Sequence, residues 1–241
     1  FDLFFWKSER LPLPYKRELH CHLIPGVDDG STSMDFSIKA LKFLESHGVE
    51  KVIFTPHYTY PRFINFPENI QPIFDDVKDT VKKKNIDIEC ENFSFEYRAE
   101  KTFEKMVLEG GAPGTPECKI RPLRGPWVLI ENGWHECSPC FENVIDSLKE
   151  KGFKVILAHP ERYRYYGETP AESYNRLLSK GAYFQCNLLS LSGYYGRLEK
   201  EVSMWMLKKG FIHFLGSDIH NSSYTEHLNQ FLKSRDYSDI Y

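Results

Sequence analysis

The sequence predicts an α/β fold built on a parallel sheet, and three observations indicate it. First, an amphipathic helical stretch that ends at glycine precedes a short β-rich run at residues 48–54, 152–157, 181–184 and 210–215. A glycine just past a helix end supplies the left-handed turn that other residues resist. Second, strand candidates alternate with helices, which is typical of parallel sheets. Third, no break between domains interrupts the series, so we expect one domain over residues 1–241.

The elements follow in order along the chain. The first helix carries an apolar stripe at Met34, Ile38 and Leu41, and Thr32 could cap it together with Asp35. Glycine and proline in the stretch 109–126 predict a long loop. Seven strands are expected, near residues 18–22, 51–57, 94–100, 127–131, 154–159, 183–187 and 212–218. Seven such units favour a barrel, with a doubly wound open sheet as the alternative.

Composition excludes several classes of function. The 241 residues are 41% hydrophobic and carry a net charge of −3, so neither nucleic acid nor an anionic membrane is expected as a partner. No apolar run is long enough to span a membrane. The apolar residues 1–6 lack the basic flank and cleavage site of a signal peptide. Six scattered cysteines are typical of reduced thiols, which predicts a cytoplasmic protein.

Side chains that commonly bind metals stand at the ends of six of the seven predicted strands. In a parallel barrel these ends share one face, where active sites are built. Converging carboxylates would repel one another unless cations lay between them. Mixed imidazole and carboxylate ligands suit Mn, Fe or Zn. A lone His-x-His is more often incidental than a ligand pair, so the prediction depends on the whole set: His20, His22, His57, Glu100, Glu131, His159, Asp218 and His220, which Asp29 could join.

The motifs carrying these residues resemble one known family. The run 18–30 (ELHCHLIPGVDDG) resembles the opening motif of bacterial protein-tyrosine phosphatases of the PHP superfamily, from capsule and exopolysaccharide loci. Residues 55–57, 158–163, 187–196 and 216–221 match further motifs in the same order, and the resemblance covers about residues 10–235. It implies a distorted (β/α)7 TIM-like barrel, the PHP fold. It also implies two or three divalent metal ions, Mn first, with Fe, Zn or Co as other candidates.

The resemblance also implies roles for individual residues. One ion would be held by His20, His22, Glu100 and Asp218, a second by Glu100, Glu131 and His159, and a third by Asp29, His57 and His220. Arg162 would bind phosphate, and His22 or Asp218 could deliver a proton. The residues after Glu100 and Glu131 depart from the family pattern, which affects the expected specificity more than the expected metal binding.

The expected function is hydrolysis of phosphotyrosine on proteins by attack of a metal-bound hydroxide. The family implies a bacterial tyrosine autokinase of polysaccharide synthesis as substrate. Two alternatives remain: a phosphoesterase for a small ester such as histidinol phosphate, and a non-catalytic, metal-binding regulatory subunit.

Two cysteine motifs offer rival interpretations. Cys118 and Arg124 have the Cys-x5-Arg spacing of cysteine-dependent phosphatases, but the intervening residues lack glycine and include Pro122. Such a loop cradles phosphate with successive backbone N–H groups, and proline has none. Cys137 and Cys140 form a lone Cys-x-x-Cys without a second pair, which predicts loop thiols rather than a zinc site.

Overall fold

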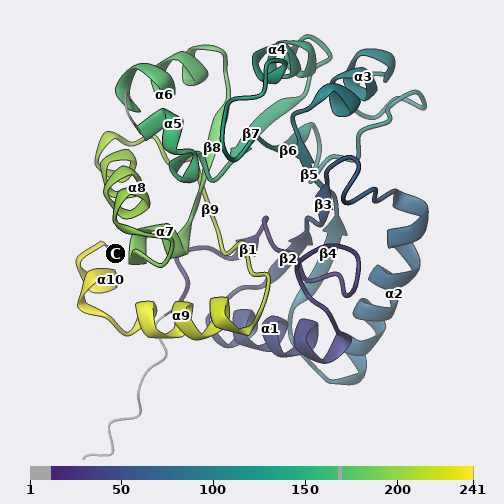
Figure 1. The fold of residues 1–241 in the computed structure, drawn as a ribbon. Coiled ribbons are helices and arrows are strands. Elements are labelled where there is room, and N and C mark those ends of the chain that lie inside the picture. The colour runs from purple at the N-terminus through teal and green to yellow at the C-terminus, as the bar shows by residue number, and fades with distance from the viewer. Residues whose placement is uncertain (1–11, 168–169, 241) are drawn as a thin grey trace, which may run out of the picture.

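A ring of parallel strands surrounded by helices organises the molecule (Figure 1). The computed structural model describes residues 12–167 and 170–240. Two sheets form the ring, with strand orders β1-β2-β4 and β3-β5-β6-β7-β8-β9, and every strand pair in them is parallel. The strands are β1 (Arg17–Glu18), β2 (Lys51–Phe54), β3 (His57–Tyr58), β4 (Glu89–Phe93), β5 (Glu96–Arg98), β6 (Trp127–Glu131), β7 (Lys154–Ala158), β8 (Tyr183–Asn187) and β9 (Phe214–Gly216).

These nine strands occupy seven positions around the ring, because β2 continues into β3 and β4 continues into β5. Pro56 lies in the first break and has no N–H to give to the ladder. Hydrogen bonds bridge both breaks: the Thr55 N–H donates to the Cys21 carbonyl (2.9 Å), and the Ser94 N–H donates to the Phe54 carbonyl (2.8 Å). The predicted seven-unit α/β barrel is therefore confirmed.

The ring closes between the end of β1 and the end of β9. Cys21 and Ile219 form a parallel bridge, and the His22 N–H donates to the Ile219 carbonyl at 3.0 Å. Below this bridge, the buried Glu18 carboxylate accepts from the backbone N–H groups of His20 (2.9 Å) and Ser217 (3.1 Å). We call these contacts the β1–β9 seam. Because the seam joins the first strand to the last, the alternative of a doubly wound open sheet is wrong.

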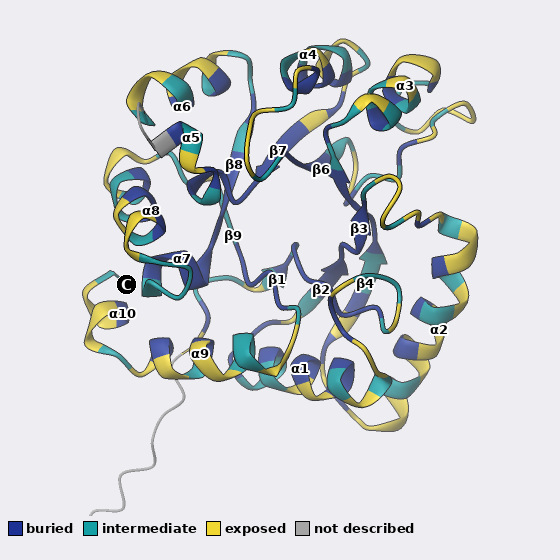
Figure 2. Ribbon diagram, viewed as in Figure 1, coloured by how far each residue is buried: buried dark blue, intermediate teal, exposed yellow. Residues whose placement is uncertain are grey.

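Helices cover the outside of the ring, with buried faces toward the strands and exposed faces outward (Figure 2). In the first helix Ser33, and not Thr32 as predicted, is the N-cap: its side chain accepts from the Phe36 N–H. The helices are α1 (Met34–Ser46), α2 (Pro67–Lys83), α3 (Lys101–Glu109), α4 (Phe141–Glu150), α5 (Arg164–Gly167), α6 (Pro170–Ser179), α7 (Leu188–Ser192), α8 (Arg197–Lys209), α9 (Ser222–Leu232) and α10 (Arg235–Ile240), with a 3₁₀ turn at Pro160–Arg162.

The core has two parts. The larger part fills the space between strands and helices, where Phe141, Val144, Ile145 and Leu148 of α4 are buried. A smaller apolar cluster fills the inside of the ring: Ile53, Leu123, Leu129, Ile156 and Ala158. Side chains two apart along a strand share a face. Glu131 on β6 therefore faces the inside of the ring, two residues after Leu129. The polar groups at the carboxyl ends of the strands thus lie next to this apolar cluster.

The third predicted strand is displaced. The sequence predicts it at 94–100, whereas β4 ends at Phe93, β5 ends at Arg98 and α3 begins at Lys101. Glu100 therefore occupies the N-cap position of α3 instead of a strand end.

The cysteines, the helices and the N-terminal residues bear on what the composition predicts. The six cysteines all lie in the described residues and form no disulfide. Within those residues, no helix combines the length and apolar character needed to cross a membrane. The apolar residues 1–6 lie outside the described part of the chain.

Candidate metal centre

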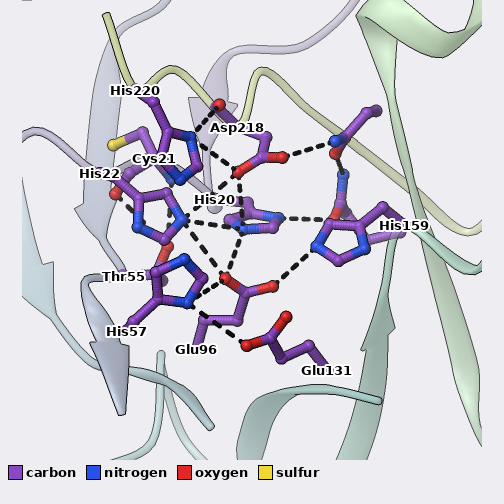
Figure 3. A network of polar contacts seen from close by, with 12 residues as sticks. His20, Cys21, His22, Thr55, His57, Glu96, Glu131, His159, Asp218 and His220 are labelled. Carbon is purple, nitrogen blue, oxygen red and sulfur yellow. Dashed lines mark hydrogen bonds and ion pairs between the residues drawn. The ribbon is translucent and has the colours of Figure 1, made fainter. Parts of the chain in front are cut away.

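Imidazole and carboxylate groups converge at the carboxyl ends of the strands, inside the mouth of the ring (Figure 3). His20 and His22 follow β1 and face the same side, while Cys21 between them is buried in the wall. Four groups each bring three candidate ligand atoms within 4.8 Å of one another: His22, His57 and His220; His20, His159 and Asp218; His20, His22 and Glu96; and His57, Glu96 and Glu131. Seven of the nine predicted ligands belong to these groups.

Glu96, on β5, lies at the centre of the cluster. Its Oε1 is 2.8 Å from His159 Nε2. Its Oε2 is 3.1 Å from His57 Nδ1 and 3.3 Å from His22 Nε2, and His20 Nε2 lies 3.4 Å away. A fully buried carboxylate among four imidazoles has the position of a ligand that bridges two neighbouring ions.

Glu100, a predicted ligand, lies outside all four groups. Its Oε1 instead accepts a hydrogen bond from the Tyr60 backbone N–H at 2.6 Å. The physical reason is the early end of β5, since the chain turns outward into α3 at residue 100. Glu96 occupies the place that the sequence analysis gave to Glu100.

Two adjacent aspartates, Asp28 and Asp29, have different positions beside the cluster. Asp29, a predicted ligand, is partly exposed, and its Oδ1 lies 3.4 Å from His57 Nε2 and 3.8 Å from His220 Nε2. The side chain of Asp28, which the sequence analysis did not single out, is buried and accepts from His22 Nδ1 (2.8 Å) and the His57 N–H (2.9 Å). Asp28 therefore orients His22 from behind, while Asp29 faces the opening.

Hydrogen bonds behind the ligands fix their orientation. His20 Nδ1 donates to Gln185 Oε1 at 2.7 Å, so its Nε2 presents a lone pair to the cluster. The Gln185 amide donates to Asn187 Oδ1 (2.9 Å), and Asn187 Nδ2 donates to Asp218 Oδ2 (2.7 Å). With Oδ2 occupied in this way, Asp218 turns its other oxygen toward His20 Nε2, which is 3.3 Å away. The sequence alone assigned no role to Asn187.

Several buried atoms in the cluster have no hydrogen-bond partner among the described residues. They are Glu96 Oε2, Glu131 Oε2, Asp218 Oδ1, His57 Nδ1 and His159 Nδ1, although some of them lie at ion-pair distance from one another. Unpartnered buried carboxylate oxygens are costly unless a cation compensates them. Both the donor types and these free atoms fit divalent transition-metal ions held among the four groups.

The carboxylates also concentrate positive charge on the imidazoles. Burial and the neighbouring His22 lower the pKa of His57, but Glu96 and Glu131 outweigh them and raise it to about 10. At the rim, burial followed by His22 lowers the pKa of His220 to about 4. The interior of the cluster therefore favours cationic charge, and protons must leave when metal cations bind.

Arg162 is fixed over the opening. Its Nη1 donates to Asp218 Oδ2 at 3.0 Å, and its guanidinium carbon lies 4.4 Å from the Trp134 ring centroid and 4.0 Å from that of Tyr195. It borders a cavity of about 350 Å³ whose other walls are Asp29, His57, Glu96, Trp134, His159, Asp218, His220, Asn221 and Tyr224. A guanidinium held between two rings can offer two parallel N–H groups to a phosphate.

The remaining predicted residues are placed as follows. His22 and Asp218 lie deep in the cluster as ligand-type groups, and proton delivery by either stays a prediction. Cys118 lies in the loop before β6, and its thiol donates to the Ile120 carbonyl at 3.1 Å. Neither Cys118 nor Cys137 lines the cavity beside Arg162. A further arginine, Arg98, donates to Glu131 Oε1 at 2.8 Å and was not anticipated.

Comparisons with known proteins agree with this architecture. A family model described as "Capsular polysaccharide synthesis, CpsB/CapC" matches residues 17–232. The tyrosine-protein phosphatase YwqE of Bacillus subtilis is 28% identical over 204 residues, covering 85% of this chain and 77% of that protein. The putative tyrosine-protein phosphatase CapC of Staphylococcus aureus is 26% identical over 208 residues, covering 85% and 76%.

Solved structures are similar over nearly the whole chain. One comes from work on YwqE of Bacillus subtilis and CpsB of Streptococcus pneumoniae, described as unique metal-dependent tyrosine phosphatases. It superposes with a TM-score of 0.76 at 25% identity and covers 93% of this chain and 90% of that one. A phosphotriesterase homology protein from Escherichia coli, at 16% identity and a TM-score of 0.50 over 93% of this chain and 89% of that one, shares the fold.

Proposed function

Because this chain belongs to the CpsB/CapC family of capsular polysaccharide synthesis, we propose that it is a metal-dependent protein-tyrosine phosphatase. The observation that carries the proposal is the buried cluster of imidazoles and carboxylates with unpartnered ligand atoms beside Arg162. The names of the relatives point to the same activity.

The protein groups have separable tasks in this reaction. Divalent ions held in the cluster would supply Lewis acidity, which activates water near neutral pH and neutralises charge on the phosphoryl oxygens. Arg162, fixed by Asp218, Trp134 and Tyr195, binds and orients the phosphoryl group above the cluster. Phenol has a pKa of about 10, so the tyrosine oxygen leaves without a strong general acid.

We propose the following division of ligands, with Glu96 in place of Glu100. His20, His22, Glu96 and Asp218 hold one ion, since their ligand atoms lie within 3.4 Å of a neighbour in the set. Glu96 would also contribute to a second ion, which Glu131 and His159 would hold with it. His57 and His220, with Asp29 at the rim, hold a third. Manganese is the proposed metal, because mixed nitrogen and oxygen ligands suit it, and Fe, Zn and Co are the competitors.

The proposed substrate is a phosphotyrosine protein, namely a bacterial tyrosine autokinase of polysaccharide synthesis. The family description supports the connection to capsular polysaccharide. We also propose that the protein works in the cytoplasm, because its composition includes six cysteines and the described residues hold all six as free thiols.

The proposal is tested by substrate comparison on metal-defined protein. Chelator-treated protein is reloaded separately with Mn, Fe, Co or Zn and assayed on a phosphotyrosine peptide, the matching phosphoserine peptide and histidinol phosphate. We expect at least one metal to restore hydrolysis, with the phosphotyrosine peptide preferred. Preference for histidinol phosphate would instead identify a small-ester phosphoesterase. Tight metal binding without turnover on any ester would identify a regulatory subunit.

A matched variant ties the activity to the cluster. His159→Ala removes the imidazole that contacts Glu96 at 2.8 Å and should abolish both metal retention and turnover. Retained metal and turnover in this variant would contradict the proposed site.

A further inference from the structure

We propose that the loop between β3 and α2 is a docking surface for the polypeptide that flanks the phosphotyrosine, and that it selects apolar side chains there. The inference rests on the proposed phosphatase function. Three exposed side chains carry it: Tyr60, Ile64 and Phe66, which we call the apolar rim. In this proposal, the apolar rim determines which sequences around a phosphotyrosine the enzyme accepts.

Exposure singles out this loop. Tyr60, Ile64 and Phe66 are 53%, 43% and 47% exposed. Only five large hydrophobic side chains of the described residues are exposed in this way, and three of them fall within seven consecutive positions. The other two, Leu108 and Leu198, stand singly on α3 and α8. Single exposed apolar residues are ordinary, whereas a cluster indicates a contact surface.

The loop contacts two residues of the metal-site opening. Phe63, between the rim residues, stacks on His57 with ring centroids 5.7 Å apart and an interplanar angle of 11°. Arg62 Nη2 lies 3.6 Å from Asp29 Oδ2. His57 and Asp29 both line the cavity beside Arg162, so Phe63 and Arg62 connect the loop that carries the apolar rim to the place where the phosphoryl group would sit.

The loop is held in shape before any substrate arrives. The backbones of Thr59 and Phe63 pair through two hydrogen bonds of 2.9 and 2.7 Å. The buried Asn65 amide donates to the carbonyls of His57 (2.9 Å) and Val27 (3.2 Å). The Glu100 carboxylate accepts from the Tyr60 N–H at 2.6 Å. A surface fixed in this way loses little conformational entropy when a partner binds.

The chemistry of the surface favours a polypeptide over a small ester. A small phosphate ester can be enclosed by a cavity of about 350 Å³ and has no atoms left to cover the rim. A peptide must leave the cavity on both sides of its phosphotyrosine, and its neighbouring side chains then cross the wall. Apolar neighbours gain about 25 cal/mol for each Å² of apolar surface that they bury, whereas small polar neighbours gain little.

The test pairs rim variants with matched peptides. The variant Tyr60→Ser/Ile64→Ser/Phe66→Ser is assayed on p-nitrophenyl phosphate and on two phosphotyrosine peptides, one flanked by isoleucine and leucine and one by serine. We expect kcat/KM on the apolar peptide to fall about tenfold, mainly through KM, which corresponds to about 1.4 kcal/mol of binding energy lost with the two aromatic anchors and Ile64. Activity on p-nitrophenyl phosphate and on the serine peptide should stay unchanged.

Two controls keep the result interpretable. Leu108→Ser removes a side chain that is 59% exposed outside the loop and should change none of the three activities. Because Phe66 is the N-cap of α2, the variant Tyr60→Ser/Ile64→Ser is measured in parallel and should show the same selective loss. Melting temperature and metal content are recorded for each variant.

Each outcome decides the question. Equal activity of rim variants and wild type on the apolar peptide would overturn the inference and leave the phosphatase proposal intact. Equal losses on all three substrates by both rim variants, with normal metal content and melting temperature, would also overturn it. A wild-type protein that cleaves p-nitrophenyl phosphate but no phosphotyrosine peptide would remove the proposed function and this inference together.

Discussion

Two variants, one at Glu96 and one at Glu100, test which of these glutamates is a metal ligand. Glu96→Gln and Glu100→Gln remove the same charge from the same side chain only four residues apart. Glu96 is fully buried and contacts four imidazoles, whereas Glu100 accepts one hydrogen bond at the start of α3. The pair therefore separates a ligand from a neighbour without changing side-chain length.

The expected losses of metal affinity in the two variants differ by orders of magnitude. Two unit charges 4 Å apart interact by about 4 kcal/mol at an effective dielectric constant of about 20, which corresponds to roughly a thousandfold change in binding. Glu96→Gln should therefore weaken metal binding by at least about a thousandfold and abolish phosphatase activity. A glutamine at position 100 still accepts from the Tyr60 N–H, so Glu100→Gln should leave metal affinity within about threefold.

The assay is metal analysis of chelated and reloaded protein, combined with turnover of p-nitrophenyl phosphate. Circular dichroism establishes that both variants fold. Loss of metal from Glu100→Gln together with full retention by Glu96→Gln would refute the assignment of the bridging ligand.

Four further predictions address other parts of the site. Arg162→Lys keeps the charge but loses the planar group held between Trp134 and Tyr195, so kcat/KM should fall about a hundredfold with unchanged metal content, and an unchanged kcat/KM would contradict phosphate binding by this residue. Asp28→Asn weakens the acceptor for His22 Nδ1 and should lower metal affinity by about 10- to 100-fold in competition titrations. Cys118→Ser should leave turnover and metal content unchanged, since its thiol donates to the Ile120 carbonyl and does not line the cavity, and lost turnover with intact metal would indicate a cysteine mechanism. In metal-free protein, the folded-state pKa of His57 is raised from 6.5 to about 10, so its stabilising contribution is fully present below pH 6.5 and is lost as the pH rises toward 10. The free energy of unfolding from urea titrations should therefore fall more steeply over this window than in His57→Asn, and identical slopes would refute the interpretation.

The barrel was predictable because its signals are local. Glycine-terminated helices and short apolar strands recur along the chain, and each repeat can be recognised without knowledge of the others. The β1–β9 seam was not predictable, since it depends on Glu18 meeting the Ser217 N–H almost two hundred residues later. No spacing rule connects two such positions.

Alternation predicted the facing of some candidate ligands. His20 and His22 are two residues apart, and Glu131 lies two residues after the inward-facing Leu129, so each pair shares a face. Glu96 and Glu100 have the same parity, so alternation alone placed both on the inner face. Their distinction depends on where β5 ends, and strand ends are the least reliable part of any sequence-based prediction.

The residues that hydrogen-bond to the candidate ligands could not be predicted from the sequence, for a different reason. Gln185, Asp28 and Arg98 act through hydrogen bonds to other side chains, and such pairs leave no periodic trace in the sequence. Arg62 and Ile64 likewise lie in an irregular segment, where exposure is decided by the packing of neighbouring elements. Only the coordinates show which residues such segments present to solvent.

The β1–β9 seam has a consequence for the life of the protein in the cell. His20 and His22 belong to one side of the seam and Asp218 to the other, and one of the proposed ions would be held by residues from both sides. A cation bound there would connect the two sides of the seam. Its binding free energy would then add to the free energy of unfolding of the barrel. A cell short of such ions would therefore lose the protein to proteases as well as losing its turnover, and metal supply would set abundance and activity together.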